Sequence, residues 1–422
     1  MTLPYPSFPT IRNPQSPIRN QAEPALPLPN KPSIVVLPFV NMSEDPKQEY
    51  FSDGITEDLT TDLSKFSGLF VIARTSAFAY KGKPLKVQEI ARELGVRYAL
   101  EGSVRKLGDQ VRITAQLVDA TSGHQLWAER YDRLFTDIFV LQEEIRRKII
   151  VHLAVRLTDV EQERLAREYT SNPEAYDFLL RGWEHFNRQT KEANAQARQM
   201  FEKAIELDPA YAEAYVGLSW TYWLEWTFLW SPNPQTLEQA FALAQKARAL
   251  DDSLAQAHIL SGRLYLWKKQ HEQAVAEAER AIALAPNFAE GYAELGFILN
   301  WAGRPEEAIG LVEKAQRLDS RNPSFYYPLT LGQSYRLTGR YEEAIAAYQR
   351  TLQLNPNLPG PHAFLAVIYN ELGREKEARA EVAEVLRLSP YFSLEVVRER
   401  FPFKDPAELE RVLDGLRKAG LK

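Results

Sequence analysis

The stretch GQSYRLTGRYEEAIAAYQRTLQLNP, residues 332–356, decides the architecture of more than half of this chain. Its last residue belongs to a series of prolines that each close a helical pattern: Pro209, Pro286, Pro323, Pro356 and Pro390. The last three gaps in this series are 37, 33 and 34 residues, and the first gap leaves room for two units. Self-similarity at this period predicts stacked helical hairpins.

Small and aromatic residues recur at fixed places between these prolines. In the quoted stretch they are Gly332, Tyr335, Ala344 and Tyr348. Small residues let the two helices of a hairpin approach closely, and the aromatic rings fill the space beside them. This pattern resembles tetratricopeptide repeats, a resemblance that implies a superhelix able to bind a protein or peptide.

We count six repeat units, and an amphipathic capping helix in residues 393–422 is expected to shield the last of them. The units span residues 176–211, 212–254, 255–288, 289–325, 326–358 and 359–392.

The residues before the repeats predict an α+β domain over residues 33–137. Short apolar runs at 34–39 and 69–74 are typical of strands, and each is followed by a helical pattern. Three alternating segments then predict a β-meander, so the expected order is β-α-β-α-β-β-β. A long helix from about residue 138 to 166 is expected to form most of a connecting segment, residues 138–175.

Three segments of this region are SIVVLPFVNMSEDPKQEYFSDGITEDLTTDLSKF, LFVIARTSAFAYKGK and ARELGVRYALEGSVRKLGDQVRITAQLVDATSGHQLWAERYDR. They resemble the TolB-like N-terminal domain, and the resemblance covers about residues 33–160. In bacterial regulators that domain often follows a class III adenylate or guanylate cyclase domain or a winged-helix DNA-binding domain, and repeats usually come after it. Here only a proline-rich stretch precedes residue 33, so the resemblance implies the accessory region and not cyclase activity.

Composition narrows the class of protein. The net charge of −5 gives no general attraction to nucleic acid, and the absence of cysteine excludes thiolate metal sites. Nine of the 26 prolines lie in residues 1–32, which predicts a disordered arm. The longest apolar run, residues 215–230, contains Glu225 and is too short for a convincing membrane span. We expect a cytoplasmic location, or a periplasmic one if a membrane anchor precedes this chain.

The sequence offers no clear catalytic site. Asp53, Glu57, Asp58 and Asp62 form an acidic group that would suit a metal or acid–base chemistry. The alternative is that Asp53 caps a helix and that the other carboxylates lie near its positive N-terminal end. No glycine-rich phosphate loop is present. We therefore expect no catalytic, cofactor-binding or metal-binding residues and no cofactor.

Two groups of residues are candidates for partner binding. The first is a row of polar side chains on the concave surface, suited to an extended peptide: Arg263, Asn300, Gln333, Arg336 and Asn370. The second belongs to the lengthened second unit and includes Trp223, Trp226 and Trp230. These aromatic residues would either form a platform for a partner or pack against the N-terminal domain or their own hairpin. A solvated helix face is the alternative for the polar row.

The favoured hypothesis is a non-enzymatic interaction protein of bacterial signalling or regulation, which binds a protein or peptide through its repeats. The alternative is a detached regulatory or sensory portion of a class III cyclase or of a transcriptional regulator. A third hypothesis, a small-molecule enzyme, would depend on an acidic residue such as Asp58. The sequence leaves the partner, the signal and the oligomeric state open.

Overall fold

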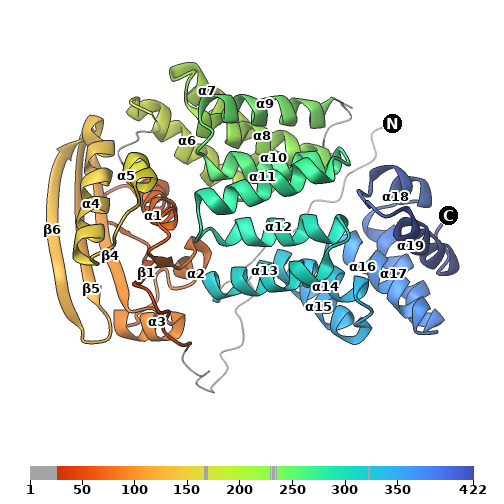
Figure 1. Ribbon diagram of the computed structural model, residues 1–422. Coiled ribbons are helices and arrows are strands. Elements are labelled where there is room, and N and C mark those ends of the chain that lie inside the picture. Colours follow the sequence, from red (N-terminus) through yellow and green to blue (C-terminus); the bar gives the residue numbers. More distant parts are fainter. Residues whose placement is uncertain (1–25, 166–169, 229, 231–232, 234, 322–323) are drawn as a thin grey trace.

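A computed structural model describes residues 26–165, 170–228, 230, 233, 235–321 and 324–422. The α+β domain and the stack of helical hairpins are both present, as the sequence predicts, and the domain packs against one side of the stack (Figure 1). Most of the expected proline-rich arm, the end of the expected connecting helix and Pro323 lie outside the described residues.

The N-terminal domain is built on one sheet with the strand order β3-β1-β4-β5-β6, and the short β2 also pairs with β4. β1 lies parallel to β3 and β4, whereas β4, β5 and β6 form the expected antiparallel meander. The strands are β1 Ser33–Val36, β2 Val40–Asn41, β3 Phe70–Val71, β4 Tyr98–Leu107, β5 Gln110–Asp119 and β6 His124–Leu134.

Helices cover both faces of the sheet around β1, which explains why that strand is apolar throughout. Ile34 and Val36 pack in a core with α1 and α4, while Val35 packs in a second core with α2 and α3. The helices of this domain are α1 Glu49–Ser64, α2 Arg74–Phe78, α3 Val87–Leu94, α4 Ile138–His152 and α5 Asp159–Leu165.

The expected cap at Asp53 is wrong. Helix α1 begins at Glu49, so Asp53 and Gly54 lie inside it. A Cβ atom on Gly54 would stand 2.5 Å from a methyl group of Leu180 in the first repeat. This glycine therefore serves close packing of α1 against the repeats and does not mark a turn before the helix.

The expected long helix from residue 138 to 166 is interrupted. Helix α4 ends at His152, Ala154 adopts a φ of 50°, and α5 starts only at Asp159. The Glu161 carboxylate accepts hydrogen bonds from the backbone N–H and the hydroxyl of Ser67, at 2.7 and 2.9 Å. This contact draws α5 to the loop after α1, and α4 packs in the domain core instead of forming a free connector.

Each predicted unit contains one helical hairpin. Its first helix is called helix A and its second helix B. The hairpins are α6 Pro173–Phe186 with α7 Lys191–Leu207, α8 Ala212–Thr227 with α9 Thr236–Leu250, α10 Ala255–Trp267 with α11 His271–Leu284, α12 Ala289–Trp301 with α13 Pro305–Leu318, α14 Tyr326–Leu337 with α15 Tyr341–Leu354, and α16 Pro359–Glu371 with α17 Glu375–Leu388.

The small residues of the repeat pattern hold the hairpins together as expected. A Cβ atom on Gly332 would stand 2.8 Å from the ring of Tyr348, which fills the space beside it. A Cβ atom on Gly262 would stand 3.0 Å from the carbonyl oxygen of Ala274. Larger side chains at these glycines would push helix A away from helix B.

The N-terminal domain docks on the ends of the repeat helices through hydrogen bonds. Before α12, Asn287 donates from its side-chain amide to the carbonyl oxygens of Ser64 and Phe66, at 3.3 and 3.0 Å. At the end of α13, the carbonyl of Leu318 accepts from the backbone N–H of Ala73 at 2.8 Å. The N-terminal domain and the repeats are therefore joined by an interface with specific hydrogen bonds.

The C-terminal segment is not the single capping helix that we expected. It forms two helices, α18 Leu394–Arg400 and α19 Pro406–Lys418, beside the last hairpins (Figure 1). Helix α19 packs on the A helices, since Asn370 of α16 donates to the carbonyl oxygen of Gly415 at 2.7 Å. Residues 398–404, which we call the strap, comprise the last turn of α18 and the segment after it, and they contact the ends of α8, α11 and α12.

Candidate functional site

A cavity of about 310 Å³ lies where the N-terminal domain meets the repeats, and we call it the interdomain cavity. The N-terminal domain lines the cavity with α1 and the start of α2, and the repeats line it with α6 and the starts of α8, α10 and α12. Four carboxylates border the cavity: Glu57 and Asp58 from α1, Glu213 from α8 and Glu290 from α12. Arg74 also borders it and pairs with Glu57 at 3.2 Å.

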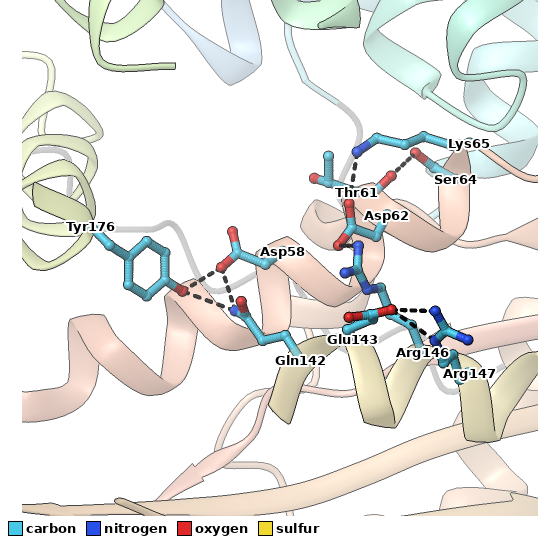
Figure 2. A network of polar contacts seen from close by, with 10 residues as sticks. All are labelled: Asp58, Thr61, Asp62, Ser64, Lys65, Gln142, Glu143, Arg146, Arg147 and Tyr176. Atoms are coloured by element: carbon cyan, nitrogen blue, oxygen red, sulfur yellow. Dashed lines mark hydrogen bonds and ion pairs between the residues drawn. The ribbon is translucent and has the colours of Figure 1, made fainter. Parts of the chain in front are cut away.

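Asp58 joins three helices by hydrogen bonds. Its carboxylate accepts from the hydroxyl of Tyr176 in α6 and from the side-chain amide of Gln142 in α4, the latter at 2.8 Å (Figure 2). One turn further along α1, Asp62 forms ion pairs with Lys65 and Arg146 (Figure 2). The acidic side of α1 is thus held by contacts within the domain and with the first repeat.

Two carboxyl groups at the cavity have pKa values raised toward neutral pH. Burial raises the pKa of Asp58 to about 7 and of Glu213 to about 8. The charge of Asp58 further raises the pKa of Glu213. Glu213 lies in the first turn of α8, which favours a negative charge, but burial outweighs this effect.

Asp58 from the N-terminal domain and Glu213 from the repeats can therefore each gain or lose a proton near neutral pH. The acidic group singled out in the sequence is not one site, because its members have separate partners: Asp53 contacts Lys81, and Asp62 contacts Arg146. Within the described ranges, no group of three or more His, Cys, Asp or Glu side chains could hold a metal ion. None of the helices in that part of the chain is long and apolar enough to span a bilayer.

The concave face, formed by the A helices, holds the predicted polar row, and its first two members already have partners. The guanidinium of Arg263 donates to Glu294 at 3.0 Å and lies 5.2 Å from the ring of Trp220. Asn300 is buried, and its amide donates to the carbonyl oxygen of Thr330 at 2.9 Å. Both side chains therefore join neighbouring A helices to one another.

Gln333, Arg336 and Asn370 lie toward the C-terminal end of the same face. Arg336 is 3% exposed and pairs with Glu408 of α19, and Asn370 binds α19 as described above. Gln333 is 1% exposed, and its side-chain Nε2 has no hydrogen-bond partner among the described residues. The alternative interpretation, a solvated helix face, does not hold for Arg336 and Asn370, which contact α19, while a role of the row in partner binding stays a prediction.

The tryptophans of the second unit form an aromatic cluster with Trp267 of α10. The rings of Trp223 and Trp226 lie 6.0 and 5.5 Å from that of Trp267. Trp223 is buried, whereas Trp226 and Trp230 are half-buried. Helix α8, which carries most of them, has 16 residues against 13 in α10, so the unit is lengthened as predicted. The cluster packs on its own and the next hairpin and reaches the strap at Arg400, 4.2 Å from the Trp226 ring.

Sequence reasoning did not find the interdomain cavity or the strap. The motif around Asp58 was visible, but its partners Gln142 and Tyr176 are 84 and 118 residues away along the chain. The strap residues Phe401, Pro402 and Phe403 break the helical pattern between α18 and α19. That interruption of the helical pattern is the one signal in the sequence that indicates a non-helical segment between these two helices.

Two family models match parts of the repeat region. A TPR repeat model matches residues 332–373, and a tetratricopeptide repeat model matches residues 255–288. The chain contains tetratricopeptide repeats. The first match includes the stretch that begins at Gly332, and the second covers the complete α10–α11 hairpin.

A curated relative is the "Putative adenylate cyclase 3" of Rhizobium meliloti (strain 1021), 48% identical over 250 residues. The match covers 59% of this chain, and the chain spans 43% of that relative. Among solved structures, the APC/C hetero-tetramer Cut9-Hcn1 is 18% identical with a TM-score of 0.43, covering 68% of this chain and 53% of that one. PilF of Pseudomonas aeruginosa is 20% identical with a TM-score of 0.38, covering 52% and 93%.

Proposed function

We propose that this protein is a non-enzymatic scaffold of a bacterial signalling or regulatory system, in which a TolB-like domain presents a tetratricopeptide superhelix to a protein or peptide partner. The observation that carries this proposal is the array of six hairpins in the described chain. Repeats of this kind stack into an extended curved surface that suits protein binding. A cytoplasmic location, and the partner-binding role of the concave residues, belong to the same proposal.

The relative named a putative adenylate cyclase favours a second candidate, a regulatory portion associated with a class III cyclase. Identity of 48% over 250 residues supports a shared region between the two proteins. Because the chain spans less than half of that relative, cyclase activity itself is not carried over. In this second candidate function, the shared region regulates the activity of a catalytic partner or senses the signal that controls it.

Capture from the native cell tests the scaffold function. The full chain, tagged and crosslinked in the cell, is expected to recover a protein whose crosslinks fall on helices α6–α17. A chain carrying Gly332→Leu is a matched control, because the new side chain would collide with Tyr348 and spread one hairpin. Repeated capture without an enriched protein would contradict the proposal.

A second experiment separates the two candidates. Cyclic nucleotide production is measured for the catalytic portion of the Rhizobium relative with and without this chain added in trans. A change in rate that depends on the added chain supports the cyclase-associated role. An unchanged rate, together with a captured partner that is not a cyclase, leaves the general scaffold as the function.

A further inference from the structure

The outer edge of the N-terminal sheet is open. Strand β6 ends the strand order, and among the described residues no other strand pairs with its second side. The backbone N–H of Phe135, just after β6, donates to the carbonyl oxygen of Asp109 beside β5. Because hydrogen bonds alternate along an antiparallel strand, every second residue of β6 directs its N–H and C=O away from β5. These residues, all exposed, are Ala128, Arg130, Asp132 and Leu134.

This edge lies on the side of the domain that faces away from the repeats (Figure 1). The opposite end of the sheet is β3, and Ala73, shortly after it, bonds the end of repeat helix α13. β6 has 11 residues, which is long for an uncovered edge, and its outward N–H and C=O groups are suited to pairing with another strand. A second chain can therefore reach this edge without meeting the repeats of the first.

The charges along β6 are complementary to themselves in one register. If two copies of β6 run antiparallel with Tyr131 facing its counterpart, Arg130 faces Asp132 on the outer side of the sheet. Glu129 then faces Arg133 on the side that α4 covers, where Tyr131 is buried. A shift by one pair in either direction places Arg130 opposite Arg130, or Asp132 opposite Asp132. Since opposite charges stabilise a strand pair and like charges destabilise it, the charged residues select one register.

Helix α4 carries a second self-complementary pattern. One stripe of the helix, with spacings of four, three and four residues, consists of Val140, Glu144, Arg147 and Val151. Its two valines are 58% and 73% exposed. Glu144 pairs with Arg133 of β6 at 3.7 Å, whereas Gln142 and Arg146 bond α1 from the other side of the helix. The stripe therefore lies on the side of α4 that is directed toward the open edge.

The stripe and the strand point to the same twofold axis. Lys148, one turn after Glu144, pairs with Glu129 at 3.3 Å, so α4 runs antiparallel to β6. Tyr131 lies midway between Glu129 and Arg133, and it is therefore level with the middle of the stripe. Around a twofold axis at Tyr131, the stripes of two copies meet antiparallel. Each valine then faces the other valine of the second copy, and each glutamate faces an arginine.

We propose that the open edge of β6 and the stripe of α4 form an interface with a second copy of this chain, in which the two β6 strands pair antiparallel about a twofold axis at Tyr131. A charged edge strand commonly prevents such pairing because its charges repel a second copy, but here they match. The exposed valines add apolar contact to the strand pairing. This inference goes beyond the scaffold function, since it concerns the N-terminal domain, and the dimer carries a repeat stack on each outer side.

Sedimentation velocity of the full chain over the micromolar range measures self-association, and the wild type is expected to dimerise. Arg130→Asp places two aspartates opposite each other at both symmetric pairs, and we expect at least about tenfold weaker association. Asp132→Arg is expected to weaken it equally. The matched control is Arg105→Asp in β4, an exposed change on the same outer face away from the edge, which should dimerise like the wild type.

Mixing the two edge variants tests the register. A chain with Arg130→Asp and a chain with Asp132→Arg place an aspartate opposite an arginine at both pairs, so we expect a heterodimer although neither variant dimerises alone. Circular dichroism checks that each variant is folded, because Asp132 also pairs with Arg112 of its own copy. If a charge reversal does not fold, Ala128→Pro replaces it, because it removes an outward N–H and leaves the ladder with β5 intact.

The helix part of the interface has its own variant. Val151→Asp puts a charge into the contact between the two copies of α4 at a position that is exposed in one copy, and it is expected to weaken association without lowering the melting temperature. A wild-type chain that stays monomeric over the micromolar range overturns the proposal. So do a dimer that the folded edge variants or Val151→Asp leave unchanged, and a mixture of the two edge variants that stays monomeric.

Discussion

The N-terminal domain and the C-terminal strap both cover the repeat stack, but they do so with different chemistry. The domain interface uses backbone carbonyls and buried amides, as in the contacts of Asn287 with Ser64 and Phe66. The strap relies on half-buried aromatic rings and on contacts of Arg400 and Lys404 at the ends of repeat helices. Groups that are nearly fully buried are costlier to separate than half-buried ones. Breaking the domain interface should therefore cost more stability than loosening the strap.

The largest expected effect comes from breaking the domain interface. Asn287→Asp replaces a donor amide by a carboxylate that faces two carbonyl oxygens at a site only 3% exposed. We expect a loss of about 3 kcal/mol in the free energy of unfolding, because a buried donor becomes a buried, repelled charge. Urea denaturation measures it, with the exposed Asn357→Asp as control. Equal stability of the two variants would show that the interface contributes little.

The cavity carboxyls predict a pH dependence of the same interface. Between about pH 4 and pH 7–8 the folded chain keeps protons on Asp58 and Glu213 that the unfolded chain has lost, because their pKa values are raised. Their contribution to stability therefore falls as the pH rises through this window. Asp58→Asn removes one titrating group and is expected to reduce the difference in stability between pH 5 and pH 8 by on the order of 2 kcal/mol.

Thermal melting at both pH values measures this change. The control is Asp109→Asn in the exposed turn between β4 and β5, which should leave the pH dependence as it is in the wild type. An unchanged difference for Asp58→Asn would mean that the cavity carboxyls do not titrate together with folding.

Loosening the strap should have a smaller and more local effect. Phe403→Ala removes a half-buried ring from Trp301 and is expected to lower global stability by about 1 kcal/mol, well below the cost of emptying a closed core. Hydrogen exchange at Lys404, whose N–H binds Trp301, should become faster while amides in α12 keep their protection. Faster exchange throughout α12 would show that the strap is an inseparable part of the fold.

The smallest expected change in stability concerns the turn between α6 and α7, away from both the N-terminal domain and the strap. Gln189, between α6 and α7, adopts a φ of 50°, whereas Gly303, Gly339 and Gly373 take this conformation in later hairpins. Gln189→Gly is expected to raise stability by about 0.5 kcal/mol, because a residue without Cβ adopts positive φ freely. Gln189→Ala keeps the Cβ atom and should give no gain. Denaturant titration of both variants separates backbone strain from loss of the side chain.

Local sequence patterns were enough to place the repeats. Gly332 and Tyr348 meet inside one hairpin, so the contact that fixes the hairpin lies within 16 residues of chain. The order of strands and helices before the repeats could also be predicted, because the apolar run around Val35 reflects burial on both faces of the sheet. Each of these conclusions depends on periodicity over short distances.

Long-range contacts decided the rest. Asp53 was expected to cap a helix, but α1 begins at Glu49 and its Gly54 packs against Leu180. The helix expected after residue 138 is broken where Glu161 meets Ser67. The polar row on the concave face was recognised as a set, but its partners in α19 and its unused donors were not. Sequence spacing carries no information about which distant segment will cover a surface.

Local periodicity is enough to predict a tetratricopeptide array after a mixed α+β domain, because helix and strand periods are local properties of the chain. The packing of distant segments places titrating carboxyls between the domain and the repeats, and it lays residues 398–404 against the ends of α8, α11 and α12. These features arise from burial and from pairing between residues more than a hundred positions apart. Such pairing depends on how the finished elements pack, and no single stretch of the sequence encodes it.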